Sequence, residues 1–197
     1  MNNHDKLLEL FHSSDEKNVG IVLEMVKNPD YAFLQAKIED YLTLYQQLYD
    51  ETVGMIEPHH IIELNDSKML IEGHHMPSLP PEIGELKHLK SLDITSCRLK
   101  KLPPEIGKLQ NLEHLDLGDN ELTKLPIGQM SKLFALILDH NPIKRMPKSI
   151  HQLPELFTLH IGETGISDKW ASKFQELHPE CEVTTILYED TWDYSNI

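Results

Sequence analysis

Long apolar runs are missing from this 197-residue chain. No stretch approaches the roughly 20 consecutive apolar residues that a membrane-spanning helix needs. Residues 1–11 carry charged side chains where a signal peptide would have its apolar core. The sequence therefore predicts neither a membrane segment nor a secretion signal.

Positive charge is also scarce. The chain has 18 Lys and Arg against 32 Asp and Glu, for a net charge of −14. Residues 1–57 hold 4 basic and 11 acidic side chains, and residues 188–197 hold 3 acidic and no basic ones. Such a surface repels phosphates, so nucleic acid is a poor candidate partner. The acidity can also serve solubility alone.

Catalytic and metal-binding motifs are absent as well. No stretch resembles a phosphate-binding loop, a zinc-protease helix or a nucleophile elbow. Cys97 and Cys181 have no histidine near them in the sequence. Among the 12 histidines are two adjacent pairs, but neighbouring side chains on a strand point to opposite faces, and the nearest carboxylates lack the spacing of a metal motif. We expect no enzyme activity, no metal and no cofactor.

One hydrophobic pattern recurs through the second half of the chain. Its clearest copy runs from Leu112 to Pro126, and three clear units and two degenerate ones can be aligned. Four of these copies begin at intervals of 23, 21 and 23 residues. Their first residues are Leu89, Leu112, Leu133 and Leu156. Within each copy an L-x-L step sends two side chains to one face of a strand. A single strand cannot bury that face alone, so successive units must stack into a solenoid.

The position after each strand holds Asn120 and Asn141 in two units, and the smaller Cys97 and Thr164 in two others. A side-chain amide both donates and accepts, so it can satisfy backbone groups where the chain turns out of the strand. A weaker first unit, residues 69–79, has His74 at this position. We interpret it as a terminal capping repeat, in which deviations are expected.

Proline marks the return segments between strands. Residues 79–86 read LPPEIGEL and residues 102–109 read LPPEIGKL. Proline fixes φ and removes a backbone donor, so these segments should form turns or single-turn helices on the convex side. Residues 125–128 lack the second Pro and the Glu, which accounts for the 21-residue interval. We expect one tighter turn there without a break in the stack.

These units closely resemble leucine-rich repeats. Over about residues 66–166 they are similar to the LPxxIGxLxxLxxLxLxxNxLxxLP pattern of the bacterial and Ras-group-related class. The resemblance implies an α/β fold: a curved right-handed solenoid with a parallel β-sheet on its concave face, short turns or 3-10 segments on its convex face, and a role in protein–protein interaction. Extracellular members have disulfide-capped ends, for which two cysteines are too few, so a reducing, cytoplasmic location is expected. Ligase members of the family need a catalytic domain for which this chain has no room.

Residues 1–57 are predicted to be an N-terminal helical cap, because a solenoid exposes an apolar end unless something covers it. Three helices are expected there: one through residues 7–11, one after a capping box at Ser13–Glu16, and a long amphipathic one over residues 34–48. Tyrosines recur at helical spacing, and such a stripe is either core against the first repeat or a binding face. They are Tyr31, Tyr41, Tyr45 and Tyr49.

The repeat domain is predicted to span residues 58–187. Ile61, Ile62 and Leu64 would add a strand between the cap and the stack. At the other end, a short helix beginning at Ser167 and a last strand over residues 183–187 would close the solenoid. Residues 188–197 form either a flexible acidic tail or a peptide that docks on another chain.

The side chains between the inward-pointing leucines are the candidate binding residues. If Leu115 and Leu117 point inward, His114 and Asp116 face the concave side, and the other units follow the same register. The predicted partner-binding residues are Glu72, Ser91, Asp93, Thr95, His114, Asp116, Ile137, Asp139, Thr158 and His160. Crowded carboxylates repel one another, and a basic peptide or helix would relieve that repulsion. The alternative is that these are ordinary solvated positions.

Two functions compete at this stage. The first is a non-catalytic scaffold that binds a protein or peptide on the concave face, because five strands about 4.8 Å apart make a shallow surface that suits a peptide or a helix. The rival is a structural protein that assembles into a homo-oligomer through the helical cap or the tail. The sequence does not identify the partner.

Overall fold

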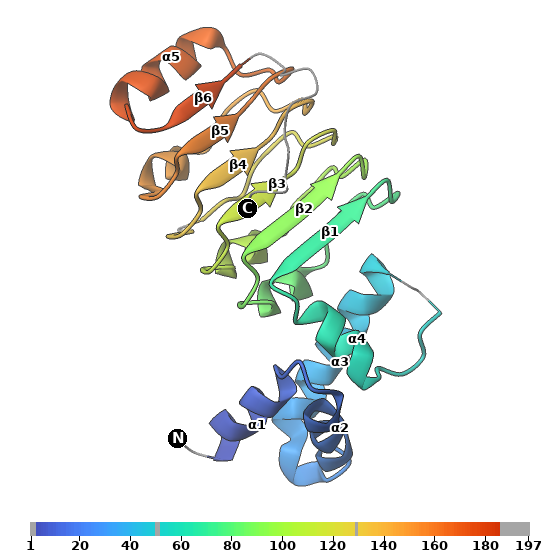
Figure 1. Ribbon diagram of the computed structural model, residues 1–197. Coiled ribbons are helices and arrows are strands. Elements are labelled where there is room, and N and C mark those ends of the chain that lie inside the picture. Colours follow the sequence, from blue (N-terminus) through green and yellow to red (C-terminus); the bar gives the residue numbers. More distant parts are fainter. Residues whose placement is uncertain (1–2, 50–51, 129, 186–197) are drawn as a thin grey trace.

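The computed structural model describes residues 3–49, 52–128 and 130–185. The molecule is elongated, with four helices at one end, a stack of repeats carrying a sheet in the middle, and one helix at the other end (Figure 1). The predicted tail, residues 188–197, lies outside the described residues. Within the described ranges, no helix is both long and apolar enough to cross a membrane.

Six strands form one parallel sheet, and their spatial order is their order in the chain. The strands are β1 (Lys68–Glu72), β2 (Ser91–Thr95), β3 (His114–Asp116), β4 (Ala135–Ile137), β5 (Thr158–His160) and β6 (Glu182–Thr184). The equivalent leucines of four aligned repeats, at 92, 115, 136 and 159, are direct partners across the sheet and are buried. The predicted α/β solenoid is confirmed. The last strand begins one residue earlier than predicted, and residues 186 and 187 lie outside the described ranges.

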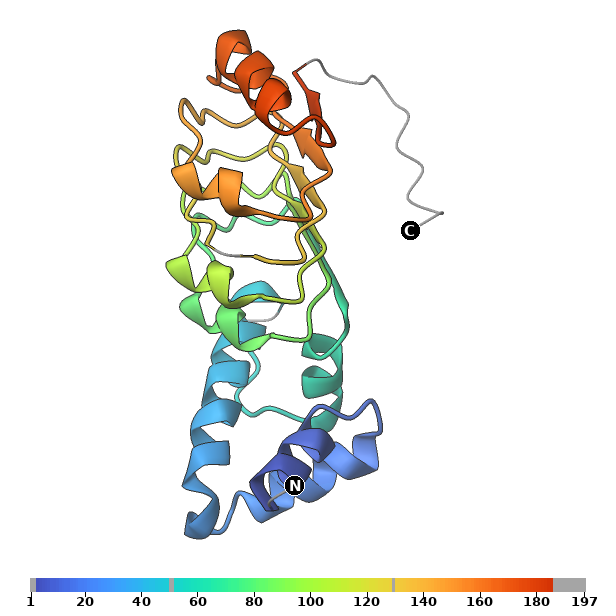
Figure 2. The same cartoon turned by 90° about the vertical axis from the view of Figure 1, so that its left-hand side faces the viewer.

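The return segments lie on the side of the stack away from the sheet (Figure 2). Three of them contain the predicted 3-10 helices, η2 (Pro81–Glu85), η3 (Pro104–Lys108) and η4 (Lys148–Gln152). Residues 125–128, in the shortened unit, contain none, and the stack continues past them. Adjacent return segments approach closely: a Cβ added at Gly84 would lie 2.8 Å from Glu105 O. A glycine is therefore required at this point of the stack.

A ladder of polar side chains ties units together at Cys97, Asn120 and Asn141, as predicted, whereas the bonds of Thr164 stay within its own unit. Asn120 Oδ1 accepts from Cys97 N at 3.1 Å and from Leu99 N at 2.9 Å, while Asn120 Nδ2 donates to Ile94 O at 2.6 Å. Asn141 repeats part of this pattern one unit later, accepting from Leu122 N at 2.9 Å. The thiol of Cys97 and the hydroxyl of Thr164 each donate to a backbone carbonyl, at 3.1 and 2.7 Å.

The first unit departs from the ladder prediction. His74 is exposed and does not enter the stack as Asn120 does. A second feature of the turn was not expected: the residue just before each ladder position has a positive φ, between 49° and 69°. These residues are Gly73, Ser96, Asp119, His140 and Glu163. Gly73 adopts this conformation freely, and Asp119 and His140 are of residue types enriched in it, whereas Ser96 and Glu163 carry no such sequence signal.

The helical end contains α1 (Asn3–Phe11), α2 (Glu16–Met25), η1 (Pro29–Tyr31), α3 (Ala32–Leu48) and α4 (Pro58–Leu64). The three predicted helices are confirmed, but the cap of α2 is Asp15, whose carboxylate accepts from Lys17 N at 2.8 Å. Ser13 accepts from Asp15 N at 3.1 Å and therefore lies before the cap, because the helix begins only at Glu16.

The predicted strand at Ile61–Leu64 is wrong, because these residues form α4. Pro58 occupies the first turn of that helix, where its missing N–H costs nothing and its fixed φ favours helix initiation. Glu57 and His60 complete a capping box at the same end. The sequence pattern misled because three apolar residues in four suit a short helix and a buried strand equally. The proposed division at residue 57 stays a prediction.

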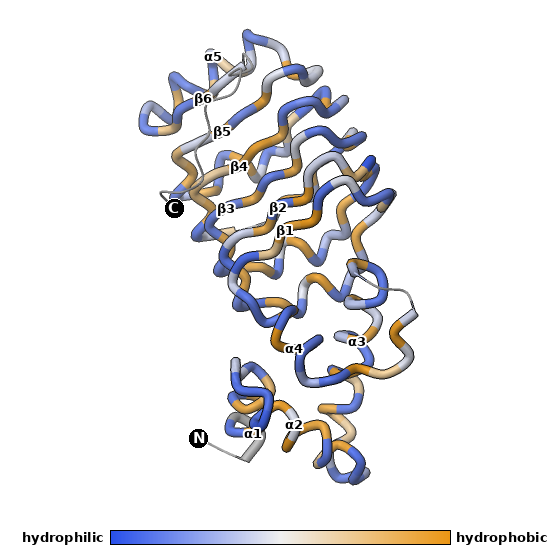
Figure 3. The backbone as a smooth tube through the Cα atoms, turned by 45° about the vertical axis from the view of Figure 1, so that its right-hand side comes forward, coloured by the Kyte–Doolittle hydropathy of each residue, from blue (hydrophilic) through white to orange (hydrophobic). Residues whose placement is uncertain are grey.

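The helical end packs against the first repeat. Lys37 of α3 lies 3.5 Å from Glu85 of η2, and Asn65, just after α4, accepts from Tyr41 Oη at 3.0 Å. Tyr41 is fully buried and Tyr45 is 8% exposed. For these two tyrosines the core interpretation is confirmed. Hydrophobic and hydrophilic segments alternate along each turn of the stack (Figure 3), as expected for units that bury one face.

The opposite end carries the predicted short helix, α5 (Asp168–Leu177). Ser167 caps it by accepting from Trp170 N at 3.3 Å, and the helix ends at His178. Ala171 and Phe174 are buried, at 5% and 2% exposed. The helix thus covers apolar residues beside β6.

Candidate binding surface on the concave face

The strands place the predicted binding residues in rows across the sheet. In the central row Asp93 is the direct partner of Asp116, Asp116 of Ile137, and Ile137 of His160. Ser91, His114 and Thr158 belong to the neighbouring row, toward the start of the strands. Glu72 and Thr95 are partners at the far ends of β1 and β2, and Asp139 follows β4. The repeat therefore brings nine of the ten positions into one sheet and places Asp139 just beyond β4.

A concave groove of about 690 Å³ runs over β1–β4. Seven of the ten predicted residues line it. They are Glu72, Ser91, Asp93, Thr95, His114, Asp116 and Ile137. This groove is open on one side and elongated, which suits an extended segment or a helix better than an enclosed small molecule.

The remaining three residues do not line the groove. Thr158 and His160 are each only 6% exposed, which corrects the expectation that β5 presents an open face. Each lies between register partners on both sides, His160 between Ile137 and Thr184. The carboxylate of Asp139 also lies 3.6 Å from His160 Nδ1. A partner seated in the groove therefore meets β1–β4.

Lys90 and Glu113 line the groove although the sequence did not single them out. Each residue directly precedes a strand, so it falls one position outside the alternation used to select candidates. Leu70, at the centre of β1, also lines the groove and is 63% exposed. An exposed leucine of this size is an apolar contact point among acidic neighbours.

The acidic side chains differ in how well they are satisfied. Asp139 Oδ1 accepts from Gly162 N at 2.5 Å and is thus turned toward β5. Asp116 Oδ1 accepts from Gly118 N at 2.8 Å. Asp93 Oδ1, by contrast, is a buried oxygen with no hydrogen-bond partner among the described residues. Buried acceptors are normally paired, so this oxygen lacks a donor.

Burial and mutual repulsion shift the acidity of this column. Burial, assisted by the negative charges of Asp93 and Asp139, raises the pKa of Asp116 to about 6. Burial also raises the pKa of Asp93; a side-chain hydrogen bond with Thr95 opposes this shift, and the charge of Glu72 adds to it. Both carboxylates would be stabilised by a nearby cation, because an opposite charge lowers a carboxyl pKa.

The groove shows no arrangement suited to covalent or metal chemistry. Over residues 3–49, 52–128 and 130–185, no group of three or more His, Cys, Asp or Glu side chains is placed to hold a metal ion. Cys97 and Cys181 are free and buried. Burial raises the pKa of Cys97, and it raises the pKa of Cys181 to about 11. This is the opposite of what a thiolate nucleophile requires.

Residues 87–143 match the family model described as leucine-rich repeat. A leucine-rich repeat protein from Leptospira interrogans is similar over 58% of this chain and 30% of its own, with 35% identity and a TM-score of 0.55. An internalin from Listeria monocytogenes is similar over 65% of this chain and 38% of its own, with 18% identity and a TM-score of 0.45. The chain thus spans less than half the length of either protein.

A search of curated proteins gives no significant match. The matched residues, the sheet in chain order and the likeness to the Leptospira protein agree with one another. The fold is a leucine-rich repeat solenoid.

Proposed function

We propose that this chain is a non-catalytic scaffold that binds a basic peptide segment or helix of another protein in the concave groove. The match to the leucine-rich repeat model supports a protein-interaction role in general terms. The repeat pattern resembles that of the bacterial and Ras-group-related class, and we propose that the chain belongs to that class. A reducing, cytoplasmic location fits two buried, free cysteines.

The unpartnered oxygen of Asp93 beside Asp116 carries the proposal. Two carboxylates face each other on adjacent strands, one with a buried acceptor that has no donor among the described residues and the other with a raised pKa. A lysine or arginine from a partner would supply the missing donor and the opposite charge. Charges of this kind steer the partner and select it against acidic competitors.

The size of the groove limits what the partner can be. About 690 Å³ over β1–β4 accommodates side chains of one segment, not a second globular domain. Leu70 gives that segment an apolar contact at one end of the groove, and Ile137 gives one at the other. The expected ligand is therefore a short segment that carries both basic and apolar side chains.

Selection of a displayed random peptide library on the immobilised chain tests this proposal. We expect the recovered peptides to be rich in lysine and arginine. Their affinity should fall about tenfold or more for the double variant Asp93→Asn with Asp116→Asn, since a buried charged pair contributes at least about 1.4 kcal/mol.

A matched control removes two carboxylates that lie off the sheet. Glu121 and Glu176 pair with surface lysines at 3.6 and 3.0 Å, and Glu121→Gln with Glu176→Gln gives the same change in net charge. Recovered peptides should bind this variant as they bind the wild type. Peptides without basic residues, or equal binding to both double variants, would refute binding in the acidic groove.

A further inference from the structure

Two phenylalanines are exposed at the edge of the sheet where the strands begin. Phe134 directly precedes β4 and Phe157 directly precedes β5, and their side chains are 42% and 45% exposed. The two rings stack, with centroids 5.2 Å apart and an angle of 11° between planes. Phenylalanine gains much by burial, so a stacked pair left in solvent marks a contact surface.

The repeat itself holds these two residues together. Phe157 N and Thr158 N both donate to Phe134 O, at 2.9 and 3.0 Å, which places the two phenylalanines at equivalent points of adjacent units. The same position is occupied by Lys90 and Glu113 in the two preceding units. Exposed aromatic rings are therefore found at this position before β4 and β5, and charged side chains before β2 and β3.

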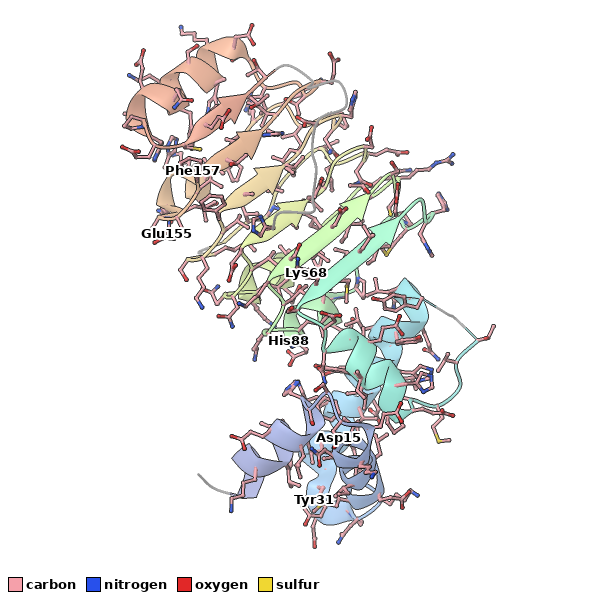
Figure 4. All side chains as sticks on the ribbon, in the orientation of Figure 1. Asp15, Tyr31, Lys68, His88, Glu155 and Phe157 are labelled. Atoms are coloured by element: carbon pink, nitrogen blue, oxygen red, sulfur yellow. The ribbon has the colours of Figure 1, made fainter. Side chains whose placement is uncertain are left out.

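An edge hollow of about 350 Å³ opens beside Phe134. It is lined by Glu113, His114, Ser131, Lys132, Phe134 and Glu155. Glu113 and His114 also line the concave groove, so the two spaces are adjacent. Glu155 and Phe157 lie together at the left edge of the sheet in Figure 4, the edge where the strands begin.

The charges around the edge hollow favour a cation. Glu155 is exposed and forms no ion pair with the residues that the structure describes. Glu113 pairs with Lys90 at 3.6 Å, and an exposed pair of this kind contributes little and is readily exchanged. Lys132, which also lines the hollow, donates to Asn111 at 2.8 Å, a residue outside the lining. Of the two carboxylates that line the hollow, Glu113 is thus held only by the exposed pair with Lys90, and Glu155 is open to a cation from a partner.

We propose that the edge hollow and the stacked phenylalanines bind an arginine side chain of the segment that occupies the concave groove. This inference rests on the proposed function and names the residue type that the surface selects. A planar guanidinium lies flat against an aromatic ring and bonds a carboxylate through two parallel N–H groups. A lysine ammonium is a hydrated point charge without that plane, so it matches the site less well.

Two synthetic peptides test the inference by fluorescence anisotropy. Both are short glycine–serine chains, one with arginines and one with lysines at the same positions. Wild-type protein should bind the arginine peptide about fivefold more tightly, the size expected of a ring–guanidinium contact near a surface. Phe134→Leu with Phe157→Leu keeps an apolar surface and should bring the two affinities together by weakening arginine binding alone.

Trp170→Leu is the matched control. Trp170 also stacks on a phenylalanine, Phe174, with centroids 5.0 Å apart, but it lies in α5. This variant should keep the preference for arginine. Glu155→Gln should reduce the preference without removing it, because the rings remain.

The outcomes separate this inference from the proposed function. If Asp93→Asn with Asp116→Asn weakens both peptides while the phenylalanine variant changes neither, the groove binds basic segments and the arginine site is refuted. Failure of the wild type to bind either peptide refutes both ideas. If the wild type sediments as a dimer that the phenylalanine variant dissociates, the pair is a contact between copies of this chain, and the arginine site is again refuted.

Discussion

The repeat stack and the helical end satisfy their buried polar groups differently. In the stack, Asn120 bonds main-chain groups of its own unit and of the preceding one, in addition to the backbone ladder of the sheet. In the helical end, each helix satisfies its own backbone, and several of the polar contacts between elements are made by side chains, as between Tyr45 and Glu63 at 2.8 Å. Damage to a repeat should therefore spread to neighbouring units, whereas damage to a helix should stay local.

Removing equal apolar volume from each region gives the largest expected effect. Leu117 and Leu34 are both fully buried, the first just after β3 and the second in α3. Either one changed to Ala should lower the free energy of unfolding by about 2–5 kcal/mol. Denaturant titration followed by circular dichroism measures this loss.

Hydrogen exchange then distinguishes the two variants. Leu117→Ala should lower protection in β2, β3 and β4 together, because these strands share hydrogen bonds. Leu34→Ala should lower protection mainly in the helical end. Equal loss of protection throughout the molecule in both variants would contradict the proposed difference.

A smaller effect is expected from removing single polar side chains. Asn120→Ala leaves Cys97 N and Leu99 N buried without their acceptor, and we expect a loss of about 3 kcal/mol. Tyr41→Phe removes one bond to Asn65 in the helical end and should cost about 1 kcal/mol. Thermal unfolding of the two variants side by side provides the measurement. A larger loss of stability for Tyr41→Phe than for Asn120→Ala would contradict this prediction.

Charge is handled differently in the two regions as well. Burial lowers the pKa of Lys37 in the helical end, and Glu85 opposes that shift. Asp116 in the stack has a raised pKa of about 6 and forms no ion pair with Lys or Arg among the described residues, and only the Gly118 N–H and the charge of His160 oppose the shift. Burial therefore destabilises the charged form of Asp116 in the stack, whereas Glu85 partly compensates the burial of charged Lys37 in the helical end.

Asp116→Asn should stabilise the protein at pH 7, an effect smaller than those of Leu117→Ala and Asn120→Ala. Because the folded pKa of about 6 exceeds the ordinary 3.8, the unfolded chain releases its proton first as pH rises, so stability falls between about pH 4 and pH 6. The shift in pKa from 3.8 to about 6 corresponds to a loss of at most about 3 kcal/mol in the free energy of unfolding. We expect Asp116→Asn to recover about 1–2 kcal/mol, because the groove is open to solvent. The gain should vanish below about pH 4, where both states are protonated.

Denaturant titrations of wild type and Asp116→Asn at pH 3.5, 5 and 7.5, roughly spanning the window set by the two pKa values, check the sign. Asp119→Asn, at an exposed carboxylate in the following turn, is the control and should show no such trend. A stabilisation by Asp116→Asn that is independent of pH would show that the charge is not its cause.

The regular parts of this fold were predictable because each depends on a short-range signal that repeats. The interval between leucines predicted the strands and their register, and Asn120 and Asn141 predicted the ladder. The proline-containing segments predicted the convex turns. The strand predicted at Ile61–Leu64 failed because a short apolar run does not distinguish helix from strand, and Pro58 decided the outcome.

The candidate site was predictable only in outline. Alternation along a strand selected the concave side chains, and seven of ten line the groove. The alternation could not show that Thr158 and His160 are buried, because burial depends on neighbours from other units. Nor could it find Phe134 and Phe157, which lie one residue before their strands and become a pair only when their units stack.

The sequence by itself determined that the chain must coil into stacked units, because leucines at a fixed interval can be buried only against their counterparts in the next turn. The tertiary structure alone decided which carboxylate oxygens lack a donor. Asp93 and Asp139 both belong to the predicted concave set, yet Asp139 accepts from the backbone N–H of Gly162, whereas Oδ1 of Asp93 has no donor among the described residues. Hydrogen bonding depends on distances of a few tenths of an ångström between units, and those distances are fixed only when the whole stack is packed.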